Sequence, residues 1–453
     1  MSEQSAVQAG SGGFAARIAR GSAFTMAGFG LSSAIRLGSN LILARLVFPE
    51  AFGIMALVTV LLVGLMMFSD IGITPSIQSS KRGDDPDFLN TAWTIQIIRS
   101  VILFSMACAL AWPMAWFYGQ PELLQLIPVT AISLLILAVQ PTRIDTASRH
   151  MILGRLTAVE LTSQILSVAV LLGVAWATGS VWAMVAGNLA AALIKVMLAW
   201  MVLPGLANRP RWEREAVSEL LHYGKWIFLS TVAGFVLLQS DKLILGRYLT
   251  MEGLGLYNIG YFLAGFPLML GHALIGRLMI PIYRENPPSR SAENFARLRR
   301  VRLALSGLLM AMMVPLALGG VWLVEFLYDA RYASSGVVVV MVAIALLPQI
   351  LTLSYDQAAL ASGDSRGFFR LNAIRAALLI TLMLLAVPSA GVAGATLAIG
   401  LTHLLSWPLV ASLAHRHGAW DRMHDALMGS LSAILALGAA LLHGSVIAAF
   451  VAG

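Results

Sequence analysis

The sequence is short of charge. Only 11% of its 453 residues are Asp, Glu, Lys or Arg, whereas a soluble domain contains about 25%. A chain of this length with so few charged residues cannot cover a surface that faces water on all sides. We therefore expect much of its outside to face lipid, which predicts a membrane protein.

Cysteine and the common catalytic motifs are also scarce. Cys108 is the only cysteine and lies in an apolar run, so the sequence predicts neither disulfides nor a cysteine metal site. We find no metal-ligand cluster, Gly-rich phosphate loop or nucleophilic triad, and we expect no metal, no cofactor and no enzymatic activity. Residues 1–20 are polar and show no cleavable signal. The net charge of +8 comes from arginines between apolar runs, which indicates membrane topology rather than nucleic-acid binding.

Apolar runs, by contrast, are abundant. Six lie near 22–46, 51–72, 91–116, 123–140, 156–177 and 180–203, six more near 223–247, 253–281, 301–325, 336–355, 368–387 and 391–413, and a last one near 425–451. Each is long enough for a membrane helix of about 20 residues, and their continuous apolarity favours helices over barrel strands. The last run predicts one span or a hairpin broken at His443-Gly444, so we expect thirteen or fourteen spans.

Basic residues alternate between the connections. Twenty of the 30 Lys and Arg residues lie at the N-terminus or in every second connection, among them Arg302 and Arg416. The other connections contain three, namely Arg45, Arg247 and Arg331. Because Lys and Arg stay on the cytoplasmic side of a membrane protein, the N-terminus is predicted to be cytoplasmic.

A short motif occurs twice at the ends of corresponding spans. It consists of an Arg, a Glu five residues later and a Gly three further on, at a constant offset of 202 residues: Arg45, Glu50 and Gly53, then Arg247, Glu252 and Gly255. Six spans separate the copies, so both halves cross the membrane in the same direction. This predicts an all-α fold of two six-helix lobes related by a pseudo-two-fold axis along the membrane normal. We expect the motif to be structural, with the Arg complementing a helix C-terminus.

The domain organisation follows from the spans and the repeat. We predict a cytoplasmic tail at 1–20, an N-lobe at 21–203, a cytoplasmic linker at 204–222, a C-lobe at 223–414 and the C-terminal span or spans at 415–453. No connection is long enough to form a domain outside the membrane.

Polar groups inside the predicted spans are the candidate site. A charge at the centre of a membrane helix costs about 2.5–3.5 kcal/mol, so each needs a partner or a wet cavity. The first span has a polar stripe at helical spacing, consisting of Ser22, Thr25, Ser32, Arg36 and Ser39, with Asn40 beside it. The stripe predicts either a cavity lining, which we favour, or a helix-packing face.

Further candidates lie on the second, third and sixth spans. Gln96 and Arg99 lie at similar depth to Asp70, which predicts an Asp70–Arg99 ion pair that braces the helices. Lys195 is another intramembrane cation, although a lysine near a helix end can extend to the interface. Together the cations of this half favour a substrate that contains phosphate.

The second half has fewer cations. Asp241 and Lys242 lie near the outer end of the seventh span, where they are candidates for the interface. His272 lies on a polar stripe of the eighth span, and histidine is the side chain best suited to proton exchange at physiological pH, so it is a candidate for proton coupling, as is Asp241. A packing role for His272 is the alternative.

Several segments of the first hundred residues resemble a known family. Residues 35–45, Pro49–Gly53, Phe68–Gly72 and Asn90–Thr94 are similar to the polysaccharide-export and oligosaccharide-flippase family, part of the multidrug/oligosaccharidyl-lipid/polysaccharide exporter superfamily. The resemblance implies a bacterial inner-membrane flippase. It would move undecaprenyl-pyrophosphate-linked sugar units to the periplasmic leaflet for exopolysaccharide, capsule or O-antigen assembly, alongside a polymerase and chain-length machinery.

Two other functions remain as alternatives. An ion-coupled antiporter of drugs or organic cations belongs to the same superfamily, but it favours acidic groups deep in a lobe. A membrane polymerase or ligase would need catalytic loops outside the membrane, whereas the predicted outward loops are only a few residues long.

Overall fold

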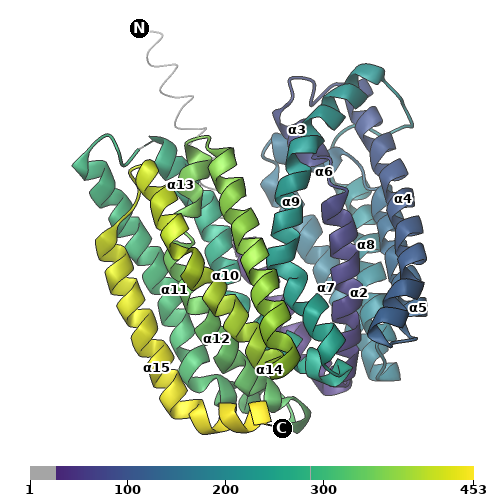
Figure 1. Ribbon diagram of the computed structural model, residues 1–453. Helices are drawn as coiled ribbons and strands as arrows, with labels where there is room; N and C mark the ends of the chain where they lie inside the picture. The colour runs from purple at the N-terminus through teal and green to yellow at the C-terminus, as the bar shows by residue number, and fades with distance from the viewer. Residues whose placement is uncertain (1–26, 286, 453) are drawn as a thin grey trace. The chain divides into compact units, whose positions relative to one another are not determined.

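The computed structural model describes residues 27–285 and 287–452, which are largely helical and include no strand (Figure 1). The predicted tail and the start of the first span, with Ser22 and Thr25, lie outside the described residues. The first helix covers residues 27–46. The other helices are α2 (Pro49–Phe68), α3 (Ile73–Ser79), α4 (Pro86–Tyr118), α5 (Leu123–Ala138), α6 (Arg143–Arg149), α7 (Leu153–Thr178), α8 (Trp182–Val202), α9 (Arg214–Tyr248), α10 (Met251–Glu285), α11 (Ala292–Leu327), α12 (Ser334–Thr352), α13 (Asp356–Ala361), α14 (Ser365–Arg416) and α15 (Arg422–Ala452), with a 3₁₀ turn at Ala330–Tyr332.

The predicted spans coincide with these helices. Helix α14 contains two of them, because Gly391 adopts a φ of 49° and breaks it. The C-terminal run forms one helix, α15, and no hairpin at His443-Gly444. Within the described residues, nine helices are long and apolar enough to cross a membrane, or ten if the bent pair of α5 and α6 is one span. This number is lower than the number of predicted spans partly because α14, which contains two of them, counts once. The first predicted span also begins before the described residues.

Local sequence signals determine where helices begin and end. Asp85 precedes α4 and accepts a hydrogen bond from the backbone N–H of Asp87 (3.0 Å), which satisfies a donor that the helix leaves open. Pro86 occupies the first helical position, where its missing N–H removes no bond. Gly119 ends the helix with a φ of 65°, a conformation that glycine adopts without strain.

Three short helices, α3, α6 and α13, are not predicted by the sequence, since six or seven residues show no clear apolar period. Two arginines of α6 close neighbouring helix ends. Arg143 donates to the carbonyl oxygens of Trp200 (2.8 Å) and Leu203 (3.2 Å), at the end of α8. Arg149 donates to the carbonyl oxygen of Ile77 (2.9 Å) in α3. Arginines that indicate topology thus also satisfy carbonyls left open at helix ends.

Each half has a basic end, defined by the connections that are rich in arginine. In the first half these connections join α3 to α4, α5 to α7 and α8 to α9, and in the second half they join α10 to α11, α13 to α14 and α14 to α15. At the opposite ends of α4, α7 and α11 lie Trp116, Trp176 and Trp322, which are 75%, 82% and 71% exposed. Exposed tryptophans at span ends are typical of the membrane–water interface.

The chain forms two compact units. Unit 1 contains the residues up to Val47 and Leu61–Thr231, and unit 2 contains Phe48–Val60 and Val232–Gly453. Helix α2 is therefore divided, because its first half packs with unit 2. Helix α9 is divided at Thr231 in the same way.

The divided helix α2 meets α10 within unit 2 through the glycines of the repeated motif. A side chain at Gly53 would overlap the carbonyl oxygen of Met251 and lie 3.1 Å from the amide nitrogen of Gly255. A side chain at Gly255 would overlap the carbonyl oxygen of Pro49 and lie 3.1 Å from the amide nitrogen of Gly53. The two helices therefore touch backbone to backbone, which only glycine permits.

This contact is reciprocal. Met251 follows Pro49, and Gly255 follows Gly53, by the same offset of 202 residues, so equivalent atoms exchange roles across a local two-fold. Glu50 and Glu252 lie in the first turns of α2 and α10, where a carboxylate favours the helix dipole. The motif thus builds two equivalent helix starts and joins them.

Gly53→Ala and Gly255→Ala should each destabilise the protein by about 1–3 kcal/mol, because the added methyl group overlaps backbone that cannot rotate away. Thermal unfolding of the detergent-purified protein measures this. Gly276→Ala on α10 is the matched control, since its methyl group would meet nothing within 4 Å. Equal melting temperatures for Gly255→Ala and Gly276→Ala would contradict the backbone contact.

Candidate functional site

The polar stripe of the first helix divides into packing and exposed groups. Ser32 exchanges two hydrogen bonds with Gln164 of α7, at 2.6 Å from its hydroxyl and 2.8 Å to its carbonyl oxygen. Ser39 donates to the carbonyl oxygen of Arg36 (3.0 Å) within the helix. The side chain of Arg36 is exposed and Asn40 is half-buried. Ser32 therefore joins two helices, whereas Arg36 lies on an accessible face.

Gln96 of α4 binds backbone carbonyl oxygens at the C-terminal end of α5. Its amide nitrogen lies 3.0 Å from the carbonyl oxygen of Leu137, 3.1 Å from that of Ala138 and 3.3 Å from that of Gln140. The carbonyl of Leu137 also accepts from the backbone N–H of Gln140 (3.1 Å), whereas those of Ala138 and Gln140 have no other hydrogen-bond partner among the described residues, and lipid cannot supply one. This contact gives Gln96 a structural role, which the sequence alone does not predict.

Arg99 of α4 binds a backbone carbonyl oxygen at the C-terminal end of α2 in a similar way. It donates to the hydroxyl of Ser69 (2.9 Å) and to the carbonyl oxygen of Met66 (2.8 Å). Asp70 instead accepts a hydrogen bond from the backbone N–H of Gly72 (2.9 Å). Among the described residues, Arg99 and Asp70 form no direct ion pair, although Asp70 lies close enough for its charge to act on Arg99. The brace exists, but it runs from the guanidinium to the open carbonyl end of α2, which also has partial negative charge.

Lys195 of α8 lies near a buried acid. Asp145 of α6 is 6% exposed and accepts a hydrogen bond from the hydroxyl of Thr74 on α3 (2.8 Å). Lys195 is half-buried and close enough to interact with the charge of Asp145. Unit 1 thus places a cation beside the short helices α3 and α6, where the spans are broken. Discontinuous helices at a polar cluster are a common setting for transport sites.

In unit 2, Asp241 of α9 is buried rather than interfacial. It is 5% exposed and accepts a hydrogen bond from the hydroxyl of Tyr257 on α10 (2.8 Å). The ammonium of Lys242 lies 3.6 Å from its other oxygen and 5.0 Å from the ring centre of Tyr261. The position near a span end suggested the interface, but packing against α10 buries the carboxylate.

His272 of α10 is exposed, and its Nδ1 lies 2.8 Å from the carbonyl oxygen of Leu268 in the same helix. Its proposed coupling role stays a prediction.

Sequence reasoning missed a buried polar network at the start of α15. Arg302 of α11 was counted with the connections, yet its side chain is fully buried. It lies 4.2 Å from the ring centre of Tyr355 and donates to the hydroxyl of Tyr283 (2.9 Å). The spacing of Arg302 and Ser306, four residues apart on a helix that is otherwise apolar inside, is the signal that indicates a buried face.

The same network continues into α15 through Asp425 and His424. Asp425 accepts hydrogen bonds from the hydroxyl of Tyr355 (2.6 Å) and from the indoles of Trp407 (3.1 Å) and Trp420 (3.0 Å). His424 lies 3.0 Å from the hydroxyl of Ser306. These bonds fix the start of the last helix against α11, α14 and the segment after α12.

A second buried pair was also missed. Arg375 of α14 is 4% exposed and donates to Asp356 of α13 at 2.8 Å. One nitrogen of Arg375, one oxygen of Asp356 and Nδ1 of His403 are buried without a hydrogen-bond partner among the described residues. Unit 2 therefore contains polar groups inside its helices, although the sequence predicts fewer cations there.

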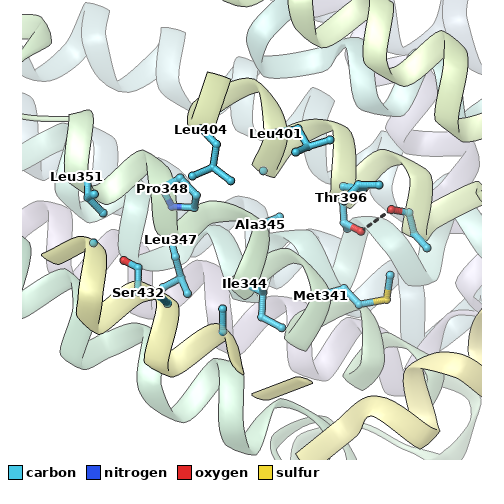
Figure 2. A pocket seen from close by; sticks show the side chains of 16 residues that line it. Met341, Ile344, Ala345, Leu347, Pro348, Leu351, Thr396, Leu401, Leu404 and Ser432 are labelled. Carbon is cyan, nitrogen blue, oxygen red and sulfur yellow. Dashed lines mark hydrogen bonds between the residues drawn. The ribbon is translucent and has the colours of Figure 1, made fainter. Parts of the chain in front are cut away.

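An apolar pocket of about 580 Å³ lies between α12, α14 and α15 (Figure 2). Its walls include Ile344, Pro348 and Leu404, and its polar edge is limited to Thr396 and Ser432. The Thr396 hydroxyl donates to carbonyl oxygens of its own helix, so the pocket suits a hydrocarbon chain and offers little to a charged group.

Comparison with solved structures defines the class of fold. The chain is similar to the lipid II flippase MurJ in an inward closed conformation, with a TM-score of 0.66 and 12% identity over 94% of this chain and 99% of that one. It is also similar to an inward-facing MATE multidrug resistance transporter of the MOP superfamily, with a TM-score of 0.60 and 13% identity over 86% and 95%. The protein therefore has the two-lobed, multi-pass helical fold of these transporters.

The family follows from sequence comparison. The model of the polysaccharide biosynthesis protein family matches residues 42–337, so the chain belongs to this family. The teichuronic acid biosynthesis protein TuaB of Bacillus subtilis (strain 168) is 23% identical over 51% of this chain and 47% of its own length. The amylovoran biosynthesis protein AmsL of Erwinia amylovora is 25% identical over 43% and 51%. The chain thus spans about half the length of the curated relatives it matches.

Gln96→Leu should lower stability by about 1–3 kcal/mol, because it leaves the carbonyls of Ala138 and Gln140 without a donor in an apolar setting. Thermal unfolding in detergent measures the loss. Gln125→Leu, an exposed glutamine of α5 without a partner among the described residues, should change stability little. Unchanged stability of Gln96→Leu would show that Gln96 does not support the fold.

The carboxyl of Asp421, in the connection before α15, should make the protein less stable in acid. Burial raises the pKa of Asp421, but hydrogen bonds from Arg299 and from the backbone of His424 outweigh it, so the pKa is lowered from 3.8. The Arg299–Asp421 pair is bidentate, at 2.5 and 3.0 Å. A carboxyl whose folded pKa is lowered stabilises the fold above pH 3.8 and loses that contribution as the pH falls through the folded pKa.

Asp421→Asn should therefore reduce stability at pH 7 by about 2 kcal/mol, since it leaves Arg299 unpaired. The further loss of stability below pH 4 should be smaller in the variant than in the wild type. Melting curves between pH 7 and pH 3 test this. Asp87→Asn, which removes an exposed carboxylate, is the control. A steep acid loss that persists unchanged in Asp421→Asn would assign it to other groups.

Proposed function

We propose that the protein is a flippase that moves undecaprenyl-pyrophosphate-linked oligosaccharide units from the cytoplasmic to the periplasmic leaflet of a bacterial inner membrane, without making or breaking a covalent bond. The family match over residues 42–337 is the observation that favours this most. TuaB and AmsL are named for the biosynthesis of surface polysaccharides, and MurJ is named a lipid II flippase. These names support a substrate that combines lipid, phosphate and sugar.

The cations of unit 1 suit such a head group. Arg36 is exposed on the first helix, and Lys195 lies half-buried beside the broken spans. Guanidinium and ammonium groups bind phosphate oxygens through charge-assisted hydrogen bonds. We propose that Arg36 and Lys195 attract the pyrophosphate, that Ser39 and Asn40 contact the sugars, and that Ser32, Gln96 and Arg99 hold the helices in place.

Movement across the membrane then requires alternating access, in which the protein opens first to one side and then to the other. The lipid tail stays in an apolar setting throughout, and the pocket between α12, α14 and α15 offers such a setting. Asp241 and His272 are the proposed coupling groups. Asp241 is the better placed, because it is buried, and one of its oxygens has no hydrogen-bond partner among the described residues and is paired only with Lys242 at 3.6 Å.

One observation favours the alternative, an ion-coupled antiporter of organic cations. A buried carboxylate such as Asp241 attracts cations or protons, and the fold is shared with multidrug transporters. Drug susceptibility of cells that overproduce the protein separates the two functions. An antiporter raises resistance to cationic drugs, whereas the proposed flippase leaves it unchanged.

Loss of the gene should abolish a surface polysaccharide and cause its lipid-linked unit to accumulate in the inner leaflet. Arg36→Gln and Lys195→Gln should each reduce export by about tenfold or more at unchanged protein level, because a charge-assisted contact to phosphate contributes about 1.5–3 kcal/mol. Polysaccharide yield per unit of membrane protein measures the effect.

The control is Lys81→Gln, which neutralises an exposed lysine outside the spans and should leave export unchanged. Normal export by an Arg36→Gln, Lys195→Gln double variant would contradict the cationic site while leaving the family unaffected.

A further inference from the structure

A polar cavity of about 370 Å³ lies at the basic end of unit 2. It is formed by the ends of α10, α13 and α14 and by the segment at 287–289. Its polar lining consists of Arg284, Ser289, Ser362, Arg416 and His417, and Tyr283, prolines and alanines form the rest. Ser362 and His417 already bind each other and their neighbours. The two arginines and the hydroxyl of Ser289 are donors suited to phosphate oxygens.

Local contacts build the walls of this cavity. Gly418 has a φ of 66° and approaches Ser289 so closely that a Cβ would lie 3.0 Å from the Cβ of Ser289. The side chain of Asn294 donates to the carbonyl oxygen of Pro287 (3.2 Å). Ser362 donates to the carbonyl oxygen of Ala358 (2.6 Å). The two turns that carry the polar groups are thus fixed to each other and to the helices.

The arginines of the cavity make no direct polar contact through their side chains. Within residues 27–285 and 287–452, neither the Arg284 nor the Arg416 side chain forms a hydrogen bond or a direct ion pair, and both are exposed. Arg416 lies close enough to Asp364 for its charge to act on that carboxylate. The nearby acid is already occupied, because Asp364 accepts from the backbone of Gly367 (2.8 Å) and lies 3.2 Å from Nε2 of His417. These contacts hold the pKa of Asp364 below 3.8, so it stays ionised and paired at neutral pH. Two guanidinium groups remain available.

The depth of the cavity indicates where the phosphate comes from. It lies where α10 and α14 end, so it is at the border between the apolar spans and water. Phosphate groups of membrane lipids lie at this depth, and basic residues there attract anionic lipids. Arginines at helix C-termini also complement the helix dipole, a role that needs no ligand and that the experiment below separates from binding.

We propose that this cavity binds a phosphate group, supplied by the head group of an anionic lipid, between Arg284 and Arg416. The hydroxyl of Ser289 provides a further donor, and the lipid tail extends into the bilayer beside α10 and α14. The site anchors unit 2 to an anionic leaflet and is independent of the transport proposed above, because it depends only on the membrane location of the chain.

Binding is tested on the purified full chain in neutral detergent, with phosphatidylglycerol, phosphatidylcholine and inorganic pyrophosphate as probes, by native mass spectrometry and thermal shift. The wild type should retain and be stabilised by phosphatidylglycerol but not phosphatidylcholine. In an Arg284→Gln, Arg416→Gln double variant, phosphatidylglycerol binding should weaken at least about tenfold. Arg370→Gln, an exposed arginine of α14 outside the cavity, should bind like the wild type.

Each outcome decides the proposal. Selective loss of phosphatidylglycerol binding supports a lipid phosphate. If pyrophosphate also stabilises the wild type but not the double variant, the site accepts free phosphates as well. If only pyrophosphate depends on the two arginines, the lipid source is wrong. Equal lipid binding by the double variant and the control, with or without a lower melting temperature, overturns the site and assigns the arginines to the helix ends.

Discussion

The backbone contact between α2 and α10 is the constraint on which the repeat depends. In lipid there is no hydrophobic force between apolar helices, so close packing of small residues has to hold them together. Gly53 and Gly255 allow this packing from both sides, with equivalent atoms in exchanged roles. The contact explains why the first half of α2 belongs to unit 2. It also explains why the motif recurs at a constant offset, because a change in either copy disturbs the other.

Polar groups within the spans follow one rule, since an open carbonyl or charge in lipid needs a partner. Gln96, Arg99 and Arg143 satisfy the ends of helices, and Arg302 stacks on Tyr355. Arginine in a membrane helix is therefore not by itself evidence of a substrate site. Two observations support a transport role. Some polar residues lie on the exposed face of the first helix or beside the broken spans, and the chain belongs to a polysaccharide biosynthesis family.

The sequence was sufficient to predict the long helices, because continuous apolar runs and alternating arginines are visible in the order of the residues and do not depend on tertiary packing. It also located the repeated motif, although not that its glycines touch, which depends on tertiary packing. The direct partners of Arg99 are Ser69 and the carbonyl of Met66 rather than Asp70. They could not be predicted, because depth along two helices does not specify which groups face each other. Arg302 was missed because it follows exposed arginines in the chain, and only burial distinguishes it. Short helices lack a period that sequence analysis can detect.

We propose that the chain by itself moves a lipid-linked anionic sugar across a bilayer. The most direct measurement uses proteoliposomes that contain the purified protein and a pyrophosphate-linked oligosaccharide lipid, with an enzyme outside that cleaves only outward-facing sugar. If the protein is a flippase, the lipid-linked sugar of the inner leaflet should become cleavable when the protein is present. In liposomes without protein, the enzyme should cleave only the sugar of the outer leaflet. Identical cleavage with and without protein, under both an imposed proton gradient and a sodium gradient, would contradict it.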